Sequence, residues 1–343
     1  MLKGAIIGFG KIVQNSHLPA FLSRELSKEM EITAVVEPDA GNREISQSKY
    51  PFLNFYLSTE ELYKNEDIDF VDIAAPPKYH ADLIEAAAEH KLNIICEKPF
   101  TFNAEEAGRI KKIIEDKKII FIPCHQYRYS PLWQKFKEVI NETCGKDNND
   151  KSILQFNVYR TSADPGLDIF DNPWRVDLKQ SGGGIIADTG IHYLYLSNWL
   201  LGKPLRISAV TDNIYHKEYK VEDTGLIIAE FEKGISQITL TWGSSGRGNS
   251  ASLISPHANL YYRGGNSLVQ RNCNAENDIS HPVPDVSDKA SYVNLYIELF
   301  NEFLETIKKR TNYNFLDEAY LSVKMLEACY SSASLCRMVL LNE

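Results

Sequence analysis

The sequence predicts an α/β protein of two domains, the first built on a parallel sheet and the second an α+β domain with a mainly antiparallel open sheet. Up to about residue 125, short runs rich in isoleucine and valine alternate with amphipathic stretches, the pattern of repeated strand–helix units. After the polar run 145–151, the strand-like segments are longer and their connections shorter. At 343 residues the chain is long enough for two domains, which we expect to be residues 1–125 and 126–343.

The first domain contains five segments with the composition of buried strands. Helical spacing of apolar residues predicts helices over Tyr79–His90 and Ala104–Lys117. Pro19 would break one long helix after Gly10, so we expect a restart near His17 with Pro19 in the first turn. The expected strands are Leu2–Ile7, Ile32–Glu37, Phe70–Ala75, Asn93–Cys96 and Ile119–Pro123.

The second domain is expected to combine longer strands with two closing helices. The run Glu232-Lys233-Gly234 between two strand segments predicts a hairpin turn. Apolar residues at helical spacing predict a long amphipathic helix over Tyr292–Ile307. Another apolar helix closes the chain, and this last helix is a candidate for packing back on the first domain. The expected strands are Ile153–Thr161, Arg206–Ile214, Gly225–Phe231 and Ile235–Trp242.

Composition and charge restrict the class of protein. With 43% hydrophobic and 24% charged residues, the chain has the composition of a soluble globular protein. A net charge of −9 argues against binding to nucleic acid or to an anionic membrane, since both depend on Lys and Arg. No signal peptide or bilayer-length apolar stretch is evident, so we expect a cytoplasmic protein with a small-molecule partner. The six cysteines form no C-x-x-C pair, which predicts neither a zinc site nor a disulfide framework.

A glycine-rich motif follows the first strand directly. Its glycines permit a sharp turn and the close approach of phosphates, and the next helix supplies free backbone amides. Val13 stands where a small residue would allow closer helix packing, and a plain turn is the alternative interpretation. The motif predicts a pyrophosphate-binding turn formed by Gly8, Phe9, Gly10, Lys11 and Ile12.

Glu37 ends the second strand, where an acidic side chain can accept hydrogen bonds from both ribose hydroxyls of an adenosine. Its charge would oppose the 2′-phosphate of NADP, so NAD is the expected cofactor. NADP is the alternative, because Arg43 a few residues further on could hold that phosphate. Arg43 could equally be a solvated surface residue.

A second motif, Glu97-Lys98-Pro99, follows the buried strand Asn93–Cys96. Ligands of open α/β sheets bind at the carboxyl ends of the strands, so Lys98 is placed for chemistry. The alternative is a simple Glu–Lys ion pair at the end of a strand.

A third motif runs from Gly182-Gly183-Gly184 to Asp188 and His192 and predicts a glycine-rich loop that opens a helix. Residues four apart lie on one helical face, so Asp188 and His192 can meet the same ligand. A histidine suits removal of a hydroxyl proton near neutral pH. The alternatives are a surface Asp–His pair and a metal site that also uses His125 or His80, but no metal-ligand spacing supports the latter.

Together the three motifs resemble the Gfo/Idh/MocA family of oxidoreductases, and the resemblance covers essentially the whole chain. Ala75-Pro76-Pro77 with His80 is similar to the family's strand end beneath the adenine side of the cofactor. The segment 126–131 resembles the stretch leading into the second domain, and Trp174-Arg175 resembles a cofactor-side pair. Val13 and Thr189 depart from the family pattern without removing a catalytic group.

The resemblance implies a Rossmann dinucleotide-binding domain and a second domain whose open sheet mediates dimer or tetramer contacts. It also implies reversible hydride transfer at a sugar, cyclitol or related polyol, without a metal. His192 would accept the hydroxyl proton, Lys98 would stabilise the charge on the same oxygen, and Asp188 would fix a neighbouring hydroxyl. Lys98 and His192 could exchange roles. Aromatic faces and charged donors suit a polyhydroxy ligand, which adds Tyr127, Arg128 and Tyr159 to the expected substrate residues.

The expected cofactor residues include both strand-end motifs and the Trp-Arg pair. They are Gly8, Phe9, Gly10, Lys11, Ile12, Glu37, Ala75, Pro76, Pro77, His80, Glu97, Lys98, Trp174 and Arg175. Two other functions stay open: a glycoside hydrolase that acts by transient oxidation on a retained NAD, and a non-catalytic dinucleotide-sensing subunit.

Overall fold

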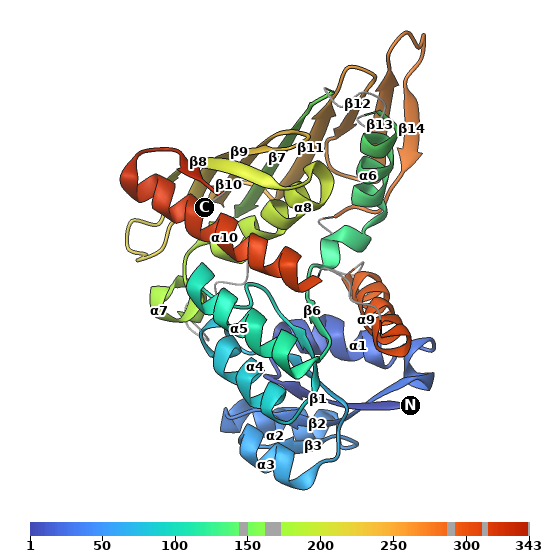
Figure 1. Cartoon of the computed structure of the whole chain (residues 1–343), viewed down its shortest axis with the longest axis vertical. Coiled ribbons are helices and arrows are strands. Elements are labelled where there is room, and N and C mark those ends of the chain that lie inside the picture. The colour runs from blue at the N-terminus through green and yellow to red at the C-terminus, as the bar shows by residue number, and fades with distance from the viewer. Residues whose placement is uncertain (144–149, 162–172, 287–291, 311–314, 342–343) are drawn as a thin grey trace. The chain divides into compact units, whose positions relative to one another are not determined.

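The structure is a computed structural model that describes residues 1–143, 150–161, 173–286, 292–310 and 315–341. The chain divides into two compact units, drawn in Figure 1. Unit 1 comprises Met1–Gln126 and Tyr292–Tyr320, and unit 2 comprises Tyr127–Ser291 and Leu321–Glu343. Two contiguous domains were expected, but residues 292–320 belong to unit 1. The polar run 145–151 lies mostly outside the described residues.

Unit 1 is built on a six-stranded parallel sheet with the strand order β3-β2-β1-β4-β5-β6. The chain order reverses between β1 and β4, which is the point where ligands bind in open α/β sheets. The five predicted strands are present. The sixth, β3, is a three-residue edge strand without an apolar run, so its composition gave no signal. The strands are β1 (Leu2–Ile7), β2 (Met30–Val36), β3 (Asn54–Tyr56), β4 (Phe70–Ile73), β5 (Asn93–Cys96) and β6 (Phe121–Pro123).

The helices of unit 1 begin where the sequence provides caps. Asp39, Ser58 and Asn103 each accept a hydrogen bond from a backbone N–H in the first turn of their helix. The break expected before Pro19 is absent: the chain is helical from Lys11 through the π-helical turn Val13–His17 into α1, and this widened turn accommodates the proline, which does lie in the first turn of α1. The helices are α1 (Leu18–Phe21), α2 (Ala40–Lys49), α3 (Thr59–Asn65), α4 (His80–Glu89), α5 (Ala104–Lys117) and α9 (Tyr292–Lys309), with short 3-10 turns over Leu26–Lys28 and Pro77–Tyr79.

Helix α9 packs against α1 and β4 of unit 1 through aromatic side chains. Phe300 stacks on Phe21 of α1 with ring centroids 4.2 Å apart, and Phe303 meets Phe70 of β4 at 5.5 Å. The predicted long amphipathic helix is therefore present and packs on the first domain. The last helix, α10 (Phe315–Leu335), also begins in unit 1, where its Asp317 pairs with Lys111 of α5. Helix α9 contributes to the N-terminal core although 165 residues of unit 2, Tyr127–Ser291, separate it from that core in the sequence.

Unit 2 contains a nine-stranded sheet with the order β14-β13-β12-β11-β7-β10-β9-β8-β15. All neighbours are antiparallel except β7 and β10, which confirms the mainly antiparallel prediction. Glu232 and Lys233 form the predicted turn between β9 and β10. The strands are β7 (Ser152–Thr161), β8 (Pro204–Asp212), β9 (Thr224–Phe231), β10 (Gly234–Ser244), β11 (Gly248–Ile254), β12 (Ala258–Tyr262), β13 (Ser267–Asn272), β14 (Ile279–Pro282) and β15 (Val339–Leu340).

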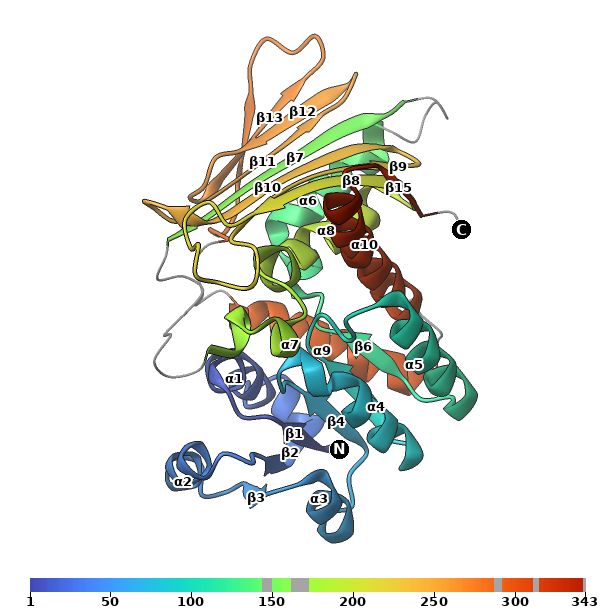
Figure 2. The same ribbon diagram turned by 90° about the vertical axis from the view of Figure 1, so that its left-hand side faces the viewer.

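One face of this sheet carries helices, among them α6 and α8 (Figure 2). Helix α8 is apolar on all sides and almost wholly buried, and its Tyr193 packs on Phe156 of β7. None of the helices that the described segments form is long and apolar enough to cross a membrane. The remaining helices are α6 (Pro131–Thr143), α7 (Leu178–Ser181), α8 (Ile191–Leu201) and α10 (Phe315–Leu335), with 3-10 turns over Gln126–Tyr129 and Pro173–Val176.

Candidate active site

The glycine turn after β1 lies close to the backbone that follows β4 at Gly8, but it is open at Gly10. Gly8 has φ +90°, and a Cβ there would lie 2.8 Å from the backbone nitrogen of Ala75. A Cβ at Gly10 would meet nothing within 4 Å. Only glycine therefore fits at Gly8, for backbone reasons, whereas the space at Gly10 is available for a ligand to approach.

The helical segment after this turn departs from α geometry. Residues Val13–His17 form a π-helical turn before α1, and Val13 is fully buried. The side-chain amide of Gln14 donates a hydrogen bond to the carbonyl oxygen of Phe9 at 3.0 Å. The bulk of Val13, which departs from the family pattern, is thus accommodated at the start of a widened turn.

Glu37 connects the end of β2 to the glycine turn. Its Oε2 accepts hydrogen bonds from the Phe9 backbone N–H at 3.1 Å and from the Asn42 side-chain amide at 2.7 Å. Its Oε1 accepts from the Asp39 backbone N–H at 2.9 Å. A carboxylate offers about four acceptor positions, so three donors leave room for a ribose hydroxyl. Asn42 was not anticipated from the sequence.

Arg43 lies beside the same strand end. One of its terminal nitrogens donates to the carbonyl oxygen of Glu37 at 2.8 Å, and the side chain is partly exposed. The structure therefore places an acidic and a basic side chain at the end of β2, as the two cofactor alternatives require.

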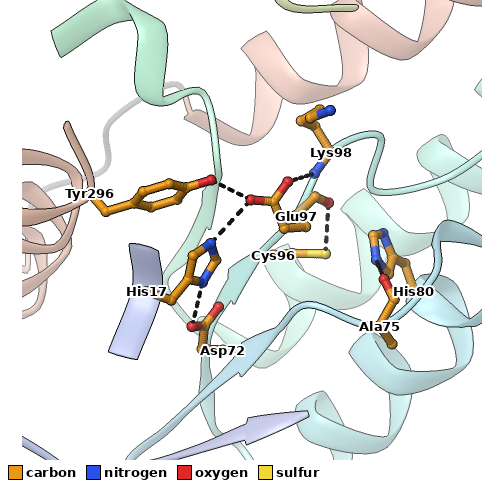
Figure 3. A network of polar contacts seen from close by, with 8 residues as sticks. All are labelled: His17, Asp72, Ala75, His80, Cys96, Glu97, Lys98 and Tyr296. Atoms are coloured by element: carbon orange, nitrogen blue, oxygen red, sulfur yellow. Dashed lines mark hydrogen bonds and ion pairs between the residues drawn. The ribbon is translucent and has the colours of Figure 1, made fainter. Parts of the chain in front are cut away.

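The second motif stands at the end of β5, where Glu97 is held by several donors (Figure 3). Glu97 Oε1 accepts hydrogen bonds from Tyr296 Oη at 2.6 Å and from His17 Nε2 at 3.2 Å. Glu97 Oε2 accepts the backbone N–H of Lys98 at 3.2 Å. The carboxylate thus fixes the backbone of the turn that carries Lys98.

His17 lies between two buried carboxylates. Its Nδ1 lies 2.8 Å from Asp72 Oδ2, and its Nε2 faces Glu97. Burial by itself lowers the pKa of His17, but the charge of Asp72 and the hydrogen bonds to both carboxylates raise it to about 9. Burial raises the pKa of Glu97, yet the hydrogen bond and charge of His17 outweigh this and hold it well below its usual range.

Sequence reasoning missed His17, Asp72 and Tyr296 as partners of Glu97. One signal was available, because Asp72 interrupts the buried run of β4 with a charge, and such residues require a partner. His17 and Tyr296 could not have been paired with it, since the three lie far apart in the chain.

His80 braces the loops that follow β4 and β5. It is fully buried, and its ring nitrogens lie 2.8 Å from the carbonyl oxygens of Pro99 and Ala75. Burial lowers its pKa. His80 thus holds the Ala75-Pro76-Pro77 segment beside the glycine turn, whose Gly8 already touches Ala75.

Among the described residues, His17, Glu97 and Cys124 offer ligand atoms within 4.8 Å of one another, close enough to hold a metal ion. His80, considered from the sequence as a metal ligand, is not part of this group, and neither is His125. The hydrogen bonds from His17 and Tyr296 to Glu97 account for the cluster without an ion.

In unit 2, the glycine-rich loop of the third motif packs too closely for side chains. A Cβ at Gly183 would lie 1.9 Å from Tyr330 Oη, and one at Gly184 would lie 1.9 Å from the carbonyl oxygen of Glu222. Gly182 ends α7 in a left-handed conformation with φ +73°. Each glycine is therefore required by a different contact.

Glu222 fixes the start of the helical segment that follows this loop. Its Oε2 accepts the backbone N–H of Gly184 at 2.8 Å. Its Oε1 accepts the backbone N–H of Ile186 at 3.0 Å and the hydroxyl of Tyr330 at 2.9 Å. Burial raises the pKa of Glu222. This clamp of Glu222 and Tyr330 was not predicted, because nothing in the local sequence links residues more than a hundred positions apart.

Asp188 lies in a π-helical turn, Ile186–Gly190, that leads into α8. Its Oδ1 pairs with Arg175 Nε at 3.2 Å, and its Oδ2 accepts the hydroxyl of Thr189 at 3.1 Å. The Arg175 guanidinium lies 4.3 Å from the ring centre of Trp174. The structure therefore brings Trp174, Arg175 and Asp188 together, three residues that the sequence had placed in two separate motifs.

His192 lies in the first turn of α8 and is oriented by two tyrosines. Its ring stacks on Tyr127 with centroids 4.3 Å apart, and its Nδ1 lies 3.0 Å from Tyr195 Oη. The same hydroxyl oxygen accepts the backbone N–H of Tyr127 at 3.0 Å. Tyr195 was not singled out from the sequence, although its spacing of three residues from His192 places it on the same helical face.

The structure does not bring Tyr159 to these residues, which corrects its expected place in the substrate pocket. Tyr159 is 39% exposed on β7, and alternation along the strand puts it on the sheet face opposite to Phe156 and α8. Arg128 lies over the rings of Tyr129 and Trp199 at 5.8 Å and 5.7 Å. Lys98 belongs to unit 1, whereas Asp188 and His192 belong to unit 2.

Comparison with known proteins gives matches over both units. Residues 2–125 match the model described as an oxidoreductase family with an NAD-binding Rossmann fold, and residues 153–258 match the GFO/IDH/MocA C-terminal domain. D-xylose 1-dehydrogenase (NADP(+)) 2 from Haloferax volcanii is 28% identical over 206 residues, which is 60% of this chain and 59% of that protein. D-apiose dehydrogenase from Paraburkholderia graminis is 27% identical over 69% of this chain and 59% of its own length.

A third relative, levoglucosan dehydrogenase from Pseudarthrobacter phenanthrenivorans, is 30% identical over 47% of this chain and 40% of its own length. The matches to these three relatives thus span less than two thirds of each relative. Among solved structures, a levoglucosan dehydrogenase in complex with NADH and levoglucosan has a TM-score of 0.85 with 19% identity and covers 100% of both chains. An oxidoreductase from Agrobacterium radiobacter in complex with NAD+, L-tartaric acid and magnesium has a TM-score of 0.84 with 20% identity, over 99% of this chain and 98% of that chain. These likenesses show that the fold is shared over the whole chain.

Proposed function

Because the chain belongs to the Gfo/Idh/MocA family of oxidoreductases, we propose that it is an NAD(P)-dependent dehydrogenase that interconverts alcohol and ketone on a sugar, cyclitol or related polyol. The observation that carries the proposal is the position of Lys98. It follows β5 at the carboxyl edge of the same sheet that carries the glycine turn and Glu37. Relatives named for xylose, apiose and levoglucosan support a carbohydrate as the substrate class.

The residues of unit 1 fit a dinucleotide. The turn Gly8–Ile12 would hold the pyrophosphate, since the backbone is exposed to a ligand at Gly10. Glu37 would hold the adenosine ribose, and the segment Ala75–Pro77, braced by His80, would flank the cofactor. Trp174 and Arg175 stay proposed cofactor residues. When bound, the nicotinamide supplies or accepts the hydride. The negative charge of Glu37 favours NAD, and Arg43 keeps NADP as the alternative.

His192 would take the hydroxyl proton at Nε2. For this, its Nδ1 must carry a proton, which it can donate to Tyr195 Oη. Stacking on Tyr127 would hold the ring in this orientation. The Lys98 ammonium would donate a hydrogen bond to the same substrate oxygen and stabilise its developing negative charge. Asp188, held by Arg175, would accept a hydrogen bond from a neighbouring hydroxyl. Lys98 and His192 could exchange the role of proton carrier.

The experiment is a screen of NAD and NADP reduction with free sugars, inositols, amino-sugars and nucleotide-sugars. With an active substrate, Lys98→Ala should lower kcat/KM by more than tenfold, a loss above about 1.4 kcal/mol of transition-state stabilisation, while NAD still binds. Lys117→Ala, at the exposed end of α5, is the control and should leave turnover unchanged. A Lys98→Ala variant within tenfold of the parent would contradict the mechanism. Glycoside cleavage on a retained cofactor without net NADH formation would favour the hydrolase alternative, and binding of NAD without any turnover would favour a sensing subunit.

We further propose that the protein assembles as a homodimer or homotetramer through the open face of the unit 2 sheet. That face exposes large apolar side chains that alternate with the buried ones, as expected for a surface that another molecule covers. They are Ile153, Tyr159, Val210, Leu226, Ile228 and Ile235. The cytoplasmic location expected from the sequence stays a prediction.

A further inference from the structure

A buried polar network in unit 1 joins three elements that the proposed function treats separately (Figure 3). His17 ends the π-helical turn that follows the glycine turn, Asp72 belongs to β4, and Glu97 follows β5. The side chains of His17 and Asp72 are fully buried, and 12% of the Glu97 side chain is exposed. Tyr296 of α9 completes the network by donating its hydroxyl hydrogen to Glu97.

The geometry determines the protonation state of this network. Both ring nitrogens of His17 face carboxylate oxygens, at 2.8 Å and 3.2 Å. Only a doubly protonated imidazolium can donate to both. Burial raises the pKa values of Cys96, Cys124 and Tyr296, so these neighbours stay neutral, and Lys98 contributes a further positive charge near Glu97. His17 is therefore the buried cation of this network, and its charge and hydrogen bond stabilise the ionised form of Glu97.

We propose that His17 is a positioning residue for Lys98. It acts through Glu97 to fix the turn that carries Lys98 in its position relative to the cofactor-binding turn Gly8–Ile12. Two contacts link His17 to Lys98. His17 holds Glu97 Oε1, and Glu97 Oε2 holds the backbone N–H of Lys98. The same histidine lies on the segment that begins at Gly10, so one side chain connects the proposed pyrophosphate site to the Lys98 turn. This inference rests on the proposed role of Lys98.

Removal of the His17 charge should change the conformation of the turn that carries Lys98, while the dinucleotide still binds. In His17→Gln, Glu97 loses the hydrogen bond and the charge of His17 that stabilise its ionised form, so its pKa rises. Glu97 then populates both its protonated and its ionised form. As a result, the backbone N–H of Lys98 no longer has a permanently ionised carboxylate as its acceptor. We expect kcat to fall by tenfold or more, with NAD affinity within about threefold of the parent. We also expect an acidic limb in the pH profile of kcat that the parent lacks.

The experiment compares His17→Gln and Tyr296→Phe with Phe300→Leu as the matched control. Phe300 packs on the His17 ring at 5.7 Å and makes no polar contact with it, so Phe300→Leu tests packing alone. Tyr296→Phe removes one donor to Glu97 and should give a smaller effect of the same kind. The proposal is overturned if His17→Gln and Phe300→Leu lower kcat equally. It is also overturned if His17→Gln introduces no new acidic limb in the pH profile of kcat.

A second measurement does not need turnover. Lysines methylated with a 13C label report their surroundings by NMR, and the Lys98 signal is identified by its absence in Lys98→Arg. In the parent chain, the His17 ring should titrate near pH 9. The Lys98 signal should shift in His17→Gln and not in Phe300→Leu. A His17 ring that titrates at or below its ordinary value, or an unmoved Lys98 signal, contradicts the positioning role even if the dehydrogenase activity is confirmed. A parent chain that turns over no sugar contradicts the proposed function, while the NMR result still decides whether His17 positions Lys98.

Discussion

At the scale of single residues, Glu37 has two tasks that compete for the same oxygens. It caps the glycine turn through the Phe9 N–H, and it is proposed to hold a ribose. Because three protein donors already orient it, the carboxylate is preorganised and needs no rearrangement to accept a hydroxyl. Arg43 donates a hydrogen bond to the backbone of the same strand end, and its positive charge could offset that of a 2′-phosphate.

Substitution of Glu37 should therefore change the choice of cofactor. In Glu37→Gln the negative charge that opposes a 2′-phosphate is gone, and the preference for NAD over NADP should fall by about tenfold, which corresponds to about 1.4 kcal/mol. Dissociation constants for both dinucleotides, measured by titration calorimetry, give this ratio. Glu44→Gln, on the exposed side of α2, serves as the control and should leave it unchanged. An unaltered ratio in Glu37→Gln would show that Glu37 does not face the 2′-position.

The buried His17 also makes a prediction about stability against pH. Its pKa is raised from 6.5 to about 9, so its contribution to the free energy of unfolding is complete below pH 6.5 and disappears as the pH rises through about 9. The pKa of Glu97 is lowered, so its contribution is complete above its ordinary value of 4.5 and is lost as the pH falls below it. The network should stabilise the fold most between about pH 4.5 and 6.5.

Thermal unfolding measured across this range tests the prediction. Between pH 6.5 and pH 9 the melting temperature of the parent should fall more than that of His17→Gln, because the variant has already lost the charge. Phe300→Leu keeps the charge of His17. Its melting temperature should therefore be lower than that of the parent but should change with pH in the same way. Parallel curves for the parent and His17→Gln would show that His17 is not protonated in the fold.

At the scale of elements, the segment that carries Asp188 and His192 depends on contacts from elsewhere in unit 2. The loop Gly182–Gly184 packs against Glu222 and Tyr330, and the carboxylate of Glu222 accepts the first free N–H groups of the π-helical turn. The π-helical turn Ile186–Gly190 carries Asp188 and precedes α8, which carries His192. It widens the backbone, so a straight α-helix would place Asp188 differently.

Gly184→Ala should disrupt this element. Its Cβ would lie 1.9 Å from a backbone oxygen, so the loop must move, and we expect a loss of stability of about 3 kcal/mol or more together with most of the activity. Gly246→Ala is the control, because a Cβ there meets nothing within 4 Å. Chemical denaturation and kcat measured on both variants test the expectation. Equal stability of the two would mean that Gly184 is not tightly enclosed.

At the scale of the whole molecule, the unit 2 sheet determines which surface is left for assembly. Alternation along β7, β9 and β10 sends one set of side chains toward α8 and the other toward the open face. That second set includes Leu226 and Ile228, which are 47% and 55% exposed. An apolar face of this kind is costly to leave in water, which supports the proposed self-association.

A charge on this face should separate the subunits. Ile228→Asp is expected to shift the protein from an oligomer to a monomer in sedimentation velocity, because a carboxylate buried at an interface lacks a partner. Ile45→Asp places the same charge at a 70% exposed position on α2 and should not change the sedimentation coefficient. A monomeric parent, or an Ile228→Asp variant that stays oligomeric, would contradict assembly through this face.

Much of the fold could be predicted from the sequence, because the signals are local. Runs of isoleucine and valine fix β1, β4 and β5, since each acts through neighbouring residues. The edge strand β3 lacks such a run. Pro19 gave a misleading signal, because the π-helical turn Val13–His17 leads into α1 without the expected break. Membership of α9 in unit 1 depends on aromatic contacts with Phe21 and Phe70 that only the folded chain creates.

The candidate site divides in the same way. The sequence by itself determined the glycine turn, Glu37, Lys98, Asp188 and His192, because each stands at a strand end or helix start that its own neighbours define. Only the tertiary structure decided which groups hold them: His17 and Tyr296 on Glu97, Arg175 on Asp188, Tyr195 on His192. It also decided that Tyr159 faces away from α8. The physical reason is that hydrogen bonds and burial join side chains by distance in space, and no local pattern records which distant residues a fold will bring within 3 Å.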